Sequence, residues 1–210
     1  MIANLLSTDE AFRKYDLNGD GKIQYDMFRA EVGNAEADGR TKYSVEDANK
    51  LLAENTALTA ANKTGDVLQR VGADQMANWS SGEANVKMSA LFQVNSEVPN
   101  IEMVICNNDD MALGAISALN DKGYNNQGSK KSGINYIPVY GVDALSTALD
   151  AIRNGKMEAT VKQDGDAMAE AIVKIAMNLK AGKSFLEGTD YKFETGVRKL
   201  RIPYAPVTEA

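Results

Sequence analysis

Short apolar runs alternate along the chain with longer segments in which apolar residues recur at helical spacing. The short runs predict strands at 23–28, 67–73, 101–106, 136–142 and 157–162, with a last extended run near 200–208. The helical spacing predicts helices at 2–15, 40–55, 81–93, 111–122, 145–154 and 168–181. Strands that alternate with helices are typical of an α/β fold, in which helices flank a parallel sheet.

The charge balance of the chain excludes some partners. Its 210 residues include 23 Lys and Arg against 29 Asp and Glu, which gives a formal net charge of −6. We therefore expect no nucleic-acid partner and no anionic membrane surface as a partner. The segment from Met1 to Asn4 lacks the basic region of a secretory signal, so we expect that the chain either is not exported or has lost its signal.

Two residue counts exclude most catalytic chemistry. The chain has no histidine, which removes Ser-His and Cys-His nucleophile pairs and every histidine-ligated metal site. Its single cysteine, Cys106, ends an apolar run and excludes an internal disulfide. Because nothing pairs a nucleophile with a base, we expect a binding protein and not an enzyme.

The strongest local motif is the segment 16–24, which reads DLNGDGKIQ. Oxygen-bearing side chains and a glycine occupy the same places in it as in the first part of an EF-hand loop. The predicted Ca²⁺ ligands are Asp16, Asn18, Asp20, Gln24 and the backbone carbonyl of Lys22. Met27 stands where an EF-hand has its bidentate glutamate, which disfavours an EF-hand sensor. Either a carboxylate comes from elsewhere in the chain, or the loop is an empty turn rich in Asx residues.

Polar residues follow each predicted strand. In a parallel sheet, ligands bind beyond the carboxyl ends of the strands, so these residues mark a candidate site. In chain order they are Asn34, Glu36, Arg40, Asn78, Trp79, Asn107, Asn108, Asp109, Asp143, Gln163 and Asp164. Amides, carboxylates, a guanidinium and an indole suit a sugar, because hydroxyls donate and accept while the pyranose face stacks on an aromatic ring. The alternatives are helix N-caps at Asn108, Asp109 and Asp143 and a core position for Trp79.

The chain resembles the periplasmic galactose/glucose-binding proteins. The resemblance rests on the 16–24 loop, on IEMVICNNDDMA at 101–112 and on PVYGVDAL at 138–145. It implies a type I periplasmic binding protein fold and a structural Ca²⁺ ion whose bidentate carboxylate is Glu102. It also implies sugar binding by Arg40, Trp79, Asn108 and Asp143. Further implied sugar positions are Gln163, Asn34 and Glu36, where the family usually has Asn, His and Asp.

The resemblance further implies that this chain is truncated at its N-terminus relative to the family. We expect residues 1–161 and 200–210 to form the C-terminal-type lobe, and residues 164–198 to be a remnant of the other lobe. Half of the sugar cleft would then be missing, so we expect a weakened sugar affinity. A helix face that has lost its sheet would seek a second copy of the chain or a missing N-terminal fragment. That face consists of Met168, Ile172, Ile175 and Leu179.

The leading interpretation is a calcium-stabilised, galactose- or glucose-binding lobe of a solute receptor for ABC transport and chemotaxis. By resemblance, its ligand would be a monosaccharide, and its protein partners would be ABC transporter membrane subunits and a chemoreceptor. Its location would be periplasmic or extracellular. The alternative is a calcium-binding structural or interaction fragment without sugar binding.

Overall fold

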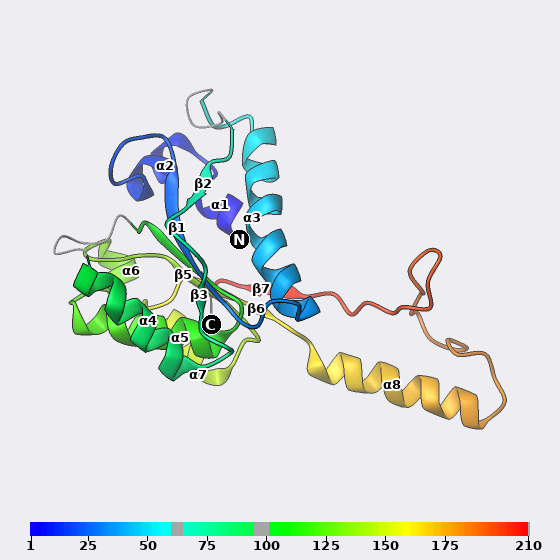
Figure 1. Ribbon diagram of the computed structural model, residues 1–210. Coiled ribbons are helices and arrows are strands. Elements are labelled where there is room, and N and C mark those ends of the chain that lie inside the picture. The colour runs from blue at the N-terminus through cyan, green and yellow to red at the C-terminus, as the bar shows by residue number, and fades with distance from the viewer. Residues whose placement is uncertain (60–64, 95–100, 210) are drawn as a thin grey trace.

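The computed structural model describes residues 1–59, 65–94 and 101–209. They form one sheet with the strand order β2-β1-β4-β5-β6-β7, and the short strand β3 also pairs with β1. The strands are β1 (Ile23–Arg29), β2 (Leu68–Arg70), β3 (Gln75–Met76), β4 (Met103–Cys106), β5 (Val139–Val142), β6 (Ala159–Lys162) and β7 (Ala205–Val207). The strands pair in parallel except for β6 and β7, which are antiparallel. This confirms the predicted α/β class, with a mostly parallel sheet flanked by helices (Figure 1).

Both faces of the sheet are buried. In β4, Met103 and Ile105 belong to one apolar cluster, whereas Val104 and Cys106 belong to the other. Strands covered on both faces read as continuous apolar runs, which is why the sequence predicts them well. The exception is Asp26 in β1, which is 1% exposed and has one carboxylate oxygen without a hydrogen-bond partner among the described residues.

Helices cover both faces. One face packs against α4 (Ser81–Val94), α5 (Asp109–Asp121) and α7 (Ser146–Arg153). The other packs against α1 (Ile2–Leu5), α2 (Asp9–Tyr15) and α3 (Ala35–Glu54). Helices α4 and α5 approach closely at Gly114, where an added Cβ would lie 2.0 Å from the carbonyl oxygen of Ser81. In chain order, the short helix α6 (Ser129–Ser132) follows α5 and precedes β5.

Several element boundaries differ from the prediction, and three of the differences have a clear local cause. The opening helix is two helices, because the Thr8 hydroxyl caps α2 by accepting a hydrogen bond from the Ala11 amide at 3.1 Å. Helix α3 begins at Ala35 rather than near residue 40, because the Asn34 side chain caps it. The strand predicted at 67–73 is shorter, because β2 ends at Arg70 and the chain then turns at Gly72, which has positive φ. The short strand β3 follows outside the predicted range.

Helix α8 (Gly165–Lys180) extends away from the sheet, and the chain then returns to place β7 beside β6 (Figure 1). In α8 only Ala171 is buried, whereas Ile172 and Met177 are 67% and 66% exposed. On the returning segment, Phe193 and Leu200 form an isolated antiparallel bridge. Among the helices that the structure describes, none is long and apolar enough to cross a membrane.

Candidate functional site

Arg40 lies at the centre of the polar residues predicted from the strand ends. Its Nη1 donates to the carbonyl oxygen of Asn107 at 2.8 Å and to Oδ1 of Asp143 at 3.4 Å. Its Nη2 donates to Oε1 of Gln163 at 3.2 Å and to Oε2 of Glu36 at 3.3 Å. One guanidinium therefore joins residues that follow β1, β4, β5 and β6 at the carboxyl edge of the sheet.

The guanidinium of Arg40 is nearly enclosed, yet it keeps a donor that the protein does not use. The side chain is 11% exposed. Its Nε–H is buried and has no hydrogen-bond partner among the described residues. A buried donor without an acceptor costs about 1–3 kcal/mol. The Asp143 and Glu36 carboxylates beside Arg40 are 28% and 59% exposed, so they are groups that a hydroxyl-rich ligand can reach.

Trp79 lies in a tight turn over residues 77–80. Both central residues have positive φ, 47° at Asn78 and 63° at Trp79, a conformation that large side chains rarely adopt. The indole N–H donates to Oε2 of Glu31 at 2.8 Å, and the Cζ atom of Arg40 lies 5.5 Å from the ring centroid. The ring is only partly buried at the margin of the core, so Trp79 is not an enclosed core residue.

The N-cap alternative is right for Asn108 and wrong for the two aspartates. The Oδ1 atom of Asn108 accepts from the Met111 amide at 3.0 Å, and its Nδ2 donates to the carbonyl oxygen of Trp79 at 3.3 Å. Asn108 therefore caps α5 and also touches the turn that carries the ring. Asp109 lies inside α5, and Asp143 precedes the N-cap position of α7.

Burial raises the pKa of the Asp143 carboxyl, although the nearby Arg40 guanidinium opposes this rise. The Asp143 side chain is 28% exposed. An acceptor that is partly desolvated and only loosely paired, at 3.4 Å from Arg40, is available to ligand hydroxyls.

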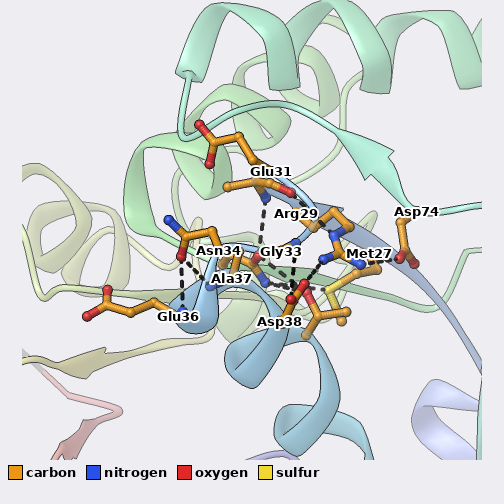
Figure 2. A network of polar contacts seen from close by, with 12 residues as sticks. Met27, Arg29, Glu31, Gly33, Asn34, Glu36, Ala37, Asp38 and Asp74 are labelled. Carbon is orange, nitrogen blue, oxygen red and sulfur yellow. Dashed lines mark hydrogen bonds and ion pairs between the residues drawn. The ribbon is translucent and has the colours of Figure 1, made fainter.

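The loop after β1 is held by ion pairs that the apolar pattern does not reveal (Figure 2). Arg29 pairs with Asp38 and, at 3.3 Å, with Asp74. The second carboxylate oxygen of Asp38 accepts from the Gly33 amide at 3.1 Å. Asn34 caps α3, because its Oδ1 accepts from the first amides of that helix at 3.0 and 3.1 Å. These contacts give a physical reason for the charged residues in a segment where the sequence indicates strand and loop.

Two more residues shape the site: Asn107, which was among the strand-end residues marking the candidate site, and Glu31, which the sequence did not single out. Asn107 is 1% exposed; its Oδ1 accepts from the Ala30 amide at 3.2 Å, and its Nδ2 donates to the Thr41 hydroxyl at 3.0 Å. These bonds fix the carbonyl that meets Arg40. The sequence indicates Asn107 through its position directly after the predicted strand, whereas nothing in the sequence distinguishes Glu31 from other surface glutamates.

The predicted calcium loop lies at the opposite, amino-terminal edge of the sheet, and its last two residues are the first two of β1. Glu102, which precedes β4, is 3% exposed. Its Oε1 accepts from the amides of Leu17 at 2.5 Å and Asn18 at 3.3 Å, and its Oε2 accepts from that of Gln24 at 2.9 Å. Burial raises the pKa of Glu102, and these amide hydrogen bonds oppose the rise. The glutamate that the resemblance implied is therefore in contact with the loop.

Within the loop, side-chain oxygens also accept from backbone amides. Asp16 accepts from the Asp20 amide at 3.1 Å, and Asp20 accepts from the Lys22 amide at 2.8 Å. The amide groups of Asn18 and Gln24 both donate to Oδ2 of Asp20. These are the bonds of an Asx-rich turn, the alternative that the sequence left open.

The chemistry of the loop nevertheless suits calcium. Its candidate donors are all oxygens, which Ca²⁺ prefers. In residues 1–59, 65–94 and 101–209, no three His, Cys, Asp or Glu side chains are grouped closely enough to hold a metal by themselves. Amide and carbonyl oxygens, such as those of Asn18, Gln24 and Lys22, would therefore have to complete the coordination.

The fold and the arrangement of side chains define an α/β lobe with polar groups gathered at the carboxyl edge of a parallel sheet. The family model of the periplasmic binding protein domain matches residues 14–184. The chain therefore belongs to the periplasmic binding protein family.

Individual relatives agree with this assignment. The chain is 37% identical over 192 residues to the D-galactose/methyl-galactoside binding periplasmic protein of Haemophilus influenzae, covering 91% of this chain and 50% of the relative. It is 29% identical over 194 residues to a putative rhizopine-binding protein of Rhizobium meliloti, again covering 91% and 50%. The chain thus spans about half the length of these curated relatives.

Solved structures share the fold. An ABC transporter solute-binding protein from Bacillus halodurans with bound myo-inositol is 28% identical, with a TM-score of 0.60, and the match covers 97% of this chain and 56% of that one. A periplasmic solute-binding protein from Actinobacillus succinogenes with bound D-allose has a TM-score of 0.63 at 18% identity, covering 94% and 58%. These matches confirm the predicted resemblance and the type I periplasmic binding protein fold.

Proposed function

We propose that this chain binds a monosaccharide, glucose or galactose, at the carboxyl edge of its sheet. The observation that carries the proposal is the convergence on Arg40, which contacts Asp143 and Gln163 and lies over the Trp79 ring. The proposed sugar ligands are Arg40, Trp79, Asn108, Asp143 and Gln163, with Asn34 and Glu36 as further contacts.

Each kind of polar or aromatic group at this edge suits a different part of a sugar. A carboxylate such as Asp143 accepts from sugar hydroxyls, and the Arg40 guanidinium donates to their oxygens. The exposed part of the Trp79 ring stacks on the apolar face of the pyranose. A few fixed polar groups around one apolar surface are typical of small-molecule sites.

The family supports a role in transport. Its relatives here are binding proteins of transport systems and not enzymes. We propose that the chain acts as a periplasmic or extracellular receptor for ABC transporter membrane subunits, with a chemoreceptor as a second partner. The name of the Haemophilus influenzae relative supports both the ligand and the location.

The division of the chain into lobes bears on its affinity for sugar. We propose that residues 1–161 and 200–210 form one lobe, and that residues 164–198 belong to a second lobe. The exposure of α8, which lies in the latter segment, supports this division. A single lobe contacts one side of a sugar, so we expect the affinity of this chain alone to be weak.

Calorimetric titration with glucose and with galactose tests the sugar proposal. Trp79 is the only tryptophan, so its fluorescence gives a second readout from the site itself. Saturable heat that disappears in Trp79→Ala supports the proposal. Tyr43→Ala is the matched control, because Tyr43 is an exposed aromatic residue outside the proposed ligand set. The absence of heat and of any fluorescence change for both sugars contradicts sugar binding and favours the alternative of a structural fragment.

We further propose that the 16–24 loop binds one structural Ca²⁺ ion. The proposed ligands are Asp16, Asn18, Asp20, Gln24, Glu102 and the carbonyl oxygen of Lys22. The contacts of Glu102 with the loop amides support this assignment. A bound cation would supply positive charge to a loop rich in carboxylate and amide oxygens and stabilise the attachment of the loop to β4. Because the loop and the sugar site lie at opposite edges of the sheet, we expect the ion to stabilise the fold rather than to contact sugar.

Thermal unfolding with calcium and with a chelator tests the calcium proposal. Calcium at 100 times its dissociation constant should add about 2.7 kcal/mol of stability, and chelation should remove it. Glu102→Gln should lose most of the calcium response. Lys22→Ala should keep it, because only the backbone of Lys22 is used. An identical melting temperature in calcium and in chelator, with no calcium binding heat, contradicts the assignment.

A further inference from the structure

The loop that carries Asp143 has an unfavourable backbone conformation. The φ angles are 121° at Asp143 and 58° at Ala144. Residues with side chains rarely adopt such values, and they persist only where the surrounding structure enforces them. The contact between Asp143 and Arg40, at 3.4 Å, is too long to enforce this conformation by itself. The Asp143 amide also donates to the carbonyl oxygen of Val161 at 2.8 Å, which ties the start of the loop to β6. A further group is needed for residues 144 and 145.

Asp109 is in the right place to hold this part of the loop. The side chain is fully buried, and its Oδ2 accepts from the backbone amide of Leu145 at 2.8 Å. Its Oδ1 accepts from the Thr160 hydroxyl at 2.6 Å, and that hydroxyl lies 3.4 Å from the Ala144 amide nitrogen. One carboxylate at the start of α5 thus connects the loop after β5 to strand β6.

The strand beneath Asp109 leaves room for this carboxylate. At Gly141 in β5, an added Cβ would lie 2.2 Å from Oδ1 of Asp109. Any other residue at 141 would displace the carboxylate. The preceding residue, Asn108, makes the equivalent connection on the other side, to the carbonyl oxygen of Trp79 at 3.3 Å. The turn at 78–79 and the loop at 143–144 are therefore both held from the start of α5, the first by the N-cap residue Asn108 and the second by Asp109.

We propose that Asp109 is a positioning residue of the sugar site, which fixes the backbone at 143–145 so that the Asp143 carboxylate faces the ligand. This inference rests on the proposed sugar binding. Asp109 does not itself contact the sugar, because it is fully buried behind the loop.

The test compares Asp109→Ala with Asp109→Asn. Asparagine keeps the shape: its Oδ1 accepts from the Leu145 amide, and its Nδ2 donates to the Thr160 hydroxyl, which then accepts. We expect Asp109→Ala to raise the dissociation constant of glucose or galactose at least tenfold, and Asp109→Asn to restore it to within about threefold of the parent chain. Leu52→Ala is the control for stability alone, because Leu52 is fully buried in the cluster on the other face of the sheet.

Hydrogen exchange gives a readout that does not depend on sugar. The Leu145 amide should exchange at least tenfold faster in Asp109→Ala, and at nearly the parent rate in Asp109→Asn and Leu52→Ala. If the parent chain binds neither sugar, the proposed function fails, and exchange alone decides whether Asp109 holds the loop. Unchanged exchange at Leu145 in Asp109→Ala overturns the inference. So does a sugar affinity in Asp109→Ala that matches the Leu52→Ala control.

Discussion

The guanidinium of Arg40 and the ring of Trp79 form a cation–π pair, with the Cζ atom 5.5 Å from the ring centroid. The two residues come from different segments, the first turns of α3 and the turn before α4. Because the same guanidinium also contacts Asn107, Asp143 and Gln163, the ring is coupled to three strand ends through one side chain. A change at Arg40 should therefore alter both the stability of the edge and the fluorescence of Trp79.

Replacement of Arg40 by lysine should damage the site although the charge is retained. An ammonium group is a point charge on a flexible stem and does not reproduce the planar fork of a guanidinium. We expect Arg40→Lys to lower the free energy of unfolding by about 1–3 kcal/mol, the cost of leaving buried partners unpaired. Urea unfolding, followed through Trp79 fluorescence, measures this directly.

The matched control for this substitution is Arg153→Lys. Arg153 is half exposed and pairs with Asp150 on the surface of α7. An exposed ion pair contributes about 0–1 kcal/mol, so this variant should unfold like the parent chain. Equal unfolding free energies for the two variants would show that Arg40 does not organise the edge. Sugar affinity should fall at least tenfold in Arg40→Lys alone.

The stability of the protein should depend on pH through Asp109. Burial, opposed by the hydrogen bonds from Thr160 and Leu145 and increased by the charge of Asp143, raises the pKa of Asp109 to about 6. Between the ordinary pKa of 3.8 and this value, the folded state binds more protons than the unfolded state. The contribution of Asp109 is therefore fully present at low pH and is lost as the pH rises through about 6.

Asp109→Asn isolates this contribution, because every other titrating group is common to both chains. From pH 4 to pH 7, the unfolding free energy of the parent chain should fall relative to the variant by on the order of 2–3 kcal/mol. Denaturant unfolding at several pH values, at constant calcium, gives the difference. A difference that stays constant across this range would mean that Asp109 titrates normally in the folded protein.

The strands of the sheet were predictable from the sequence, because burial on both faces leaves a signal in the residues of each strand itself. A strand buried on both faces must be apolar throughout, and Met103–Cys106 meets that condition with every residue buried. The split between α1 and α2 was not predicted, since the apolar spacing continues across it. There the hydroxyl of Thr8 decides the boundary, and a single capping bond leaves no periodic signal.

The candidate site was predictable only as far as chain position reveals it. Arg40, Asp143 and Gln163 follow predicted strands, and the parallel topology brings them together. The ion pairs of Arg29 with Asp38 and Asp74 were not predictable, because they depend on how α3 and the segment before β3 pack beside the end of β1 (Figure 2).

Two glycines in helices should respond in opposite ways to alanine. At Gly39 in α3, the nearest atom to an added Cβ is Cδ2 of Tyr43 at 4.0 Å, so a methyl group fits. Gly39→Ala should raise the free energy of unfolding by about 0.5–1 kcal/mol, because alanine favours the helix. At Gly114, the added Cβ would lie 2.0 Å from the backbone of Ser81, so Gly114→Ala must push α4 away from α5.

We expect Gly114→Ala to cost at least about 1–3 kcal/mol, the range for overpacked cores. Urea unfolding of the two variants, each compared with the parent chain, measures both effects. Destabilisation by Gly39→Ala would mean that the start of α3 is not a regular helix in solution. A neutral Gly114→Ala would mean that the two helices are not in contact there.

The apolar surface of α8 should make the chain self-associate. Ile172 and Leu179, which are seven residues apart and therefore lie on the same side of α8, are 67% and 50% exposed. Exposed apolar surface of this kind marks an interaction site. Sedimentation velocity over a wide concentration range should show a shift from monomer to a larger species. The double variant Ile172→Glu, Leu179→Glu should sediment as a monomer throughout, because burying two carboxylates in an interface is unfavourable. Val86→Glu is the control, since Val86 is about as exposed as Ile172, at 66%, but lies on α4. If the parent chain is monomeric at every concentration, or if Val86→Glu abolishes association as well, α8 is not the contact surface.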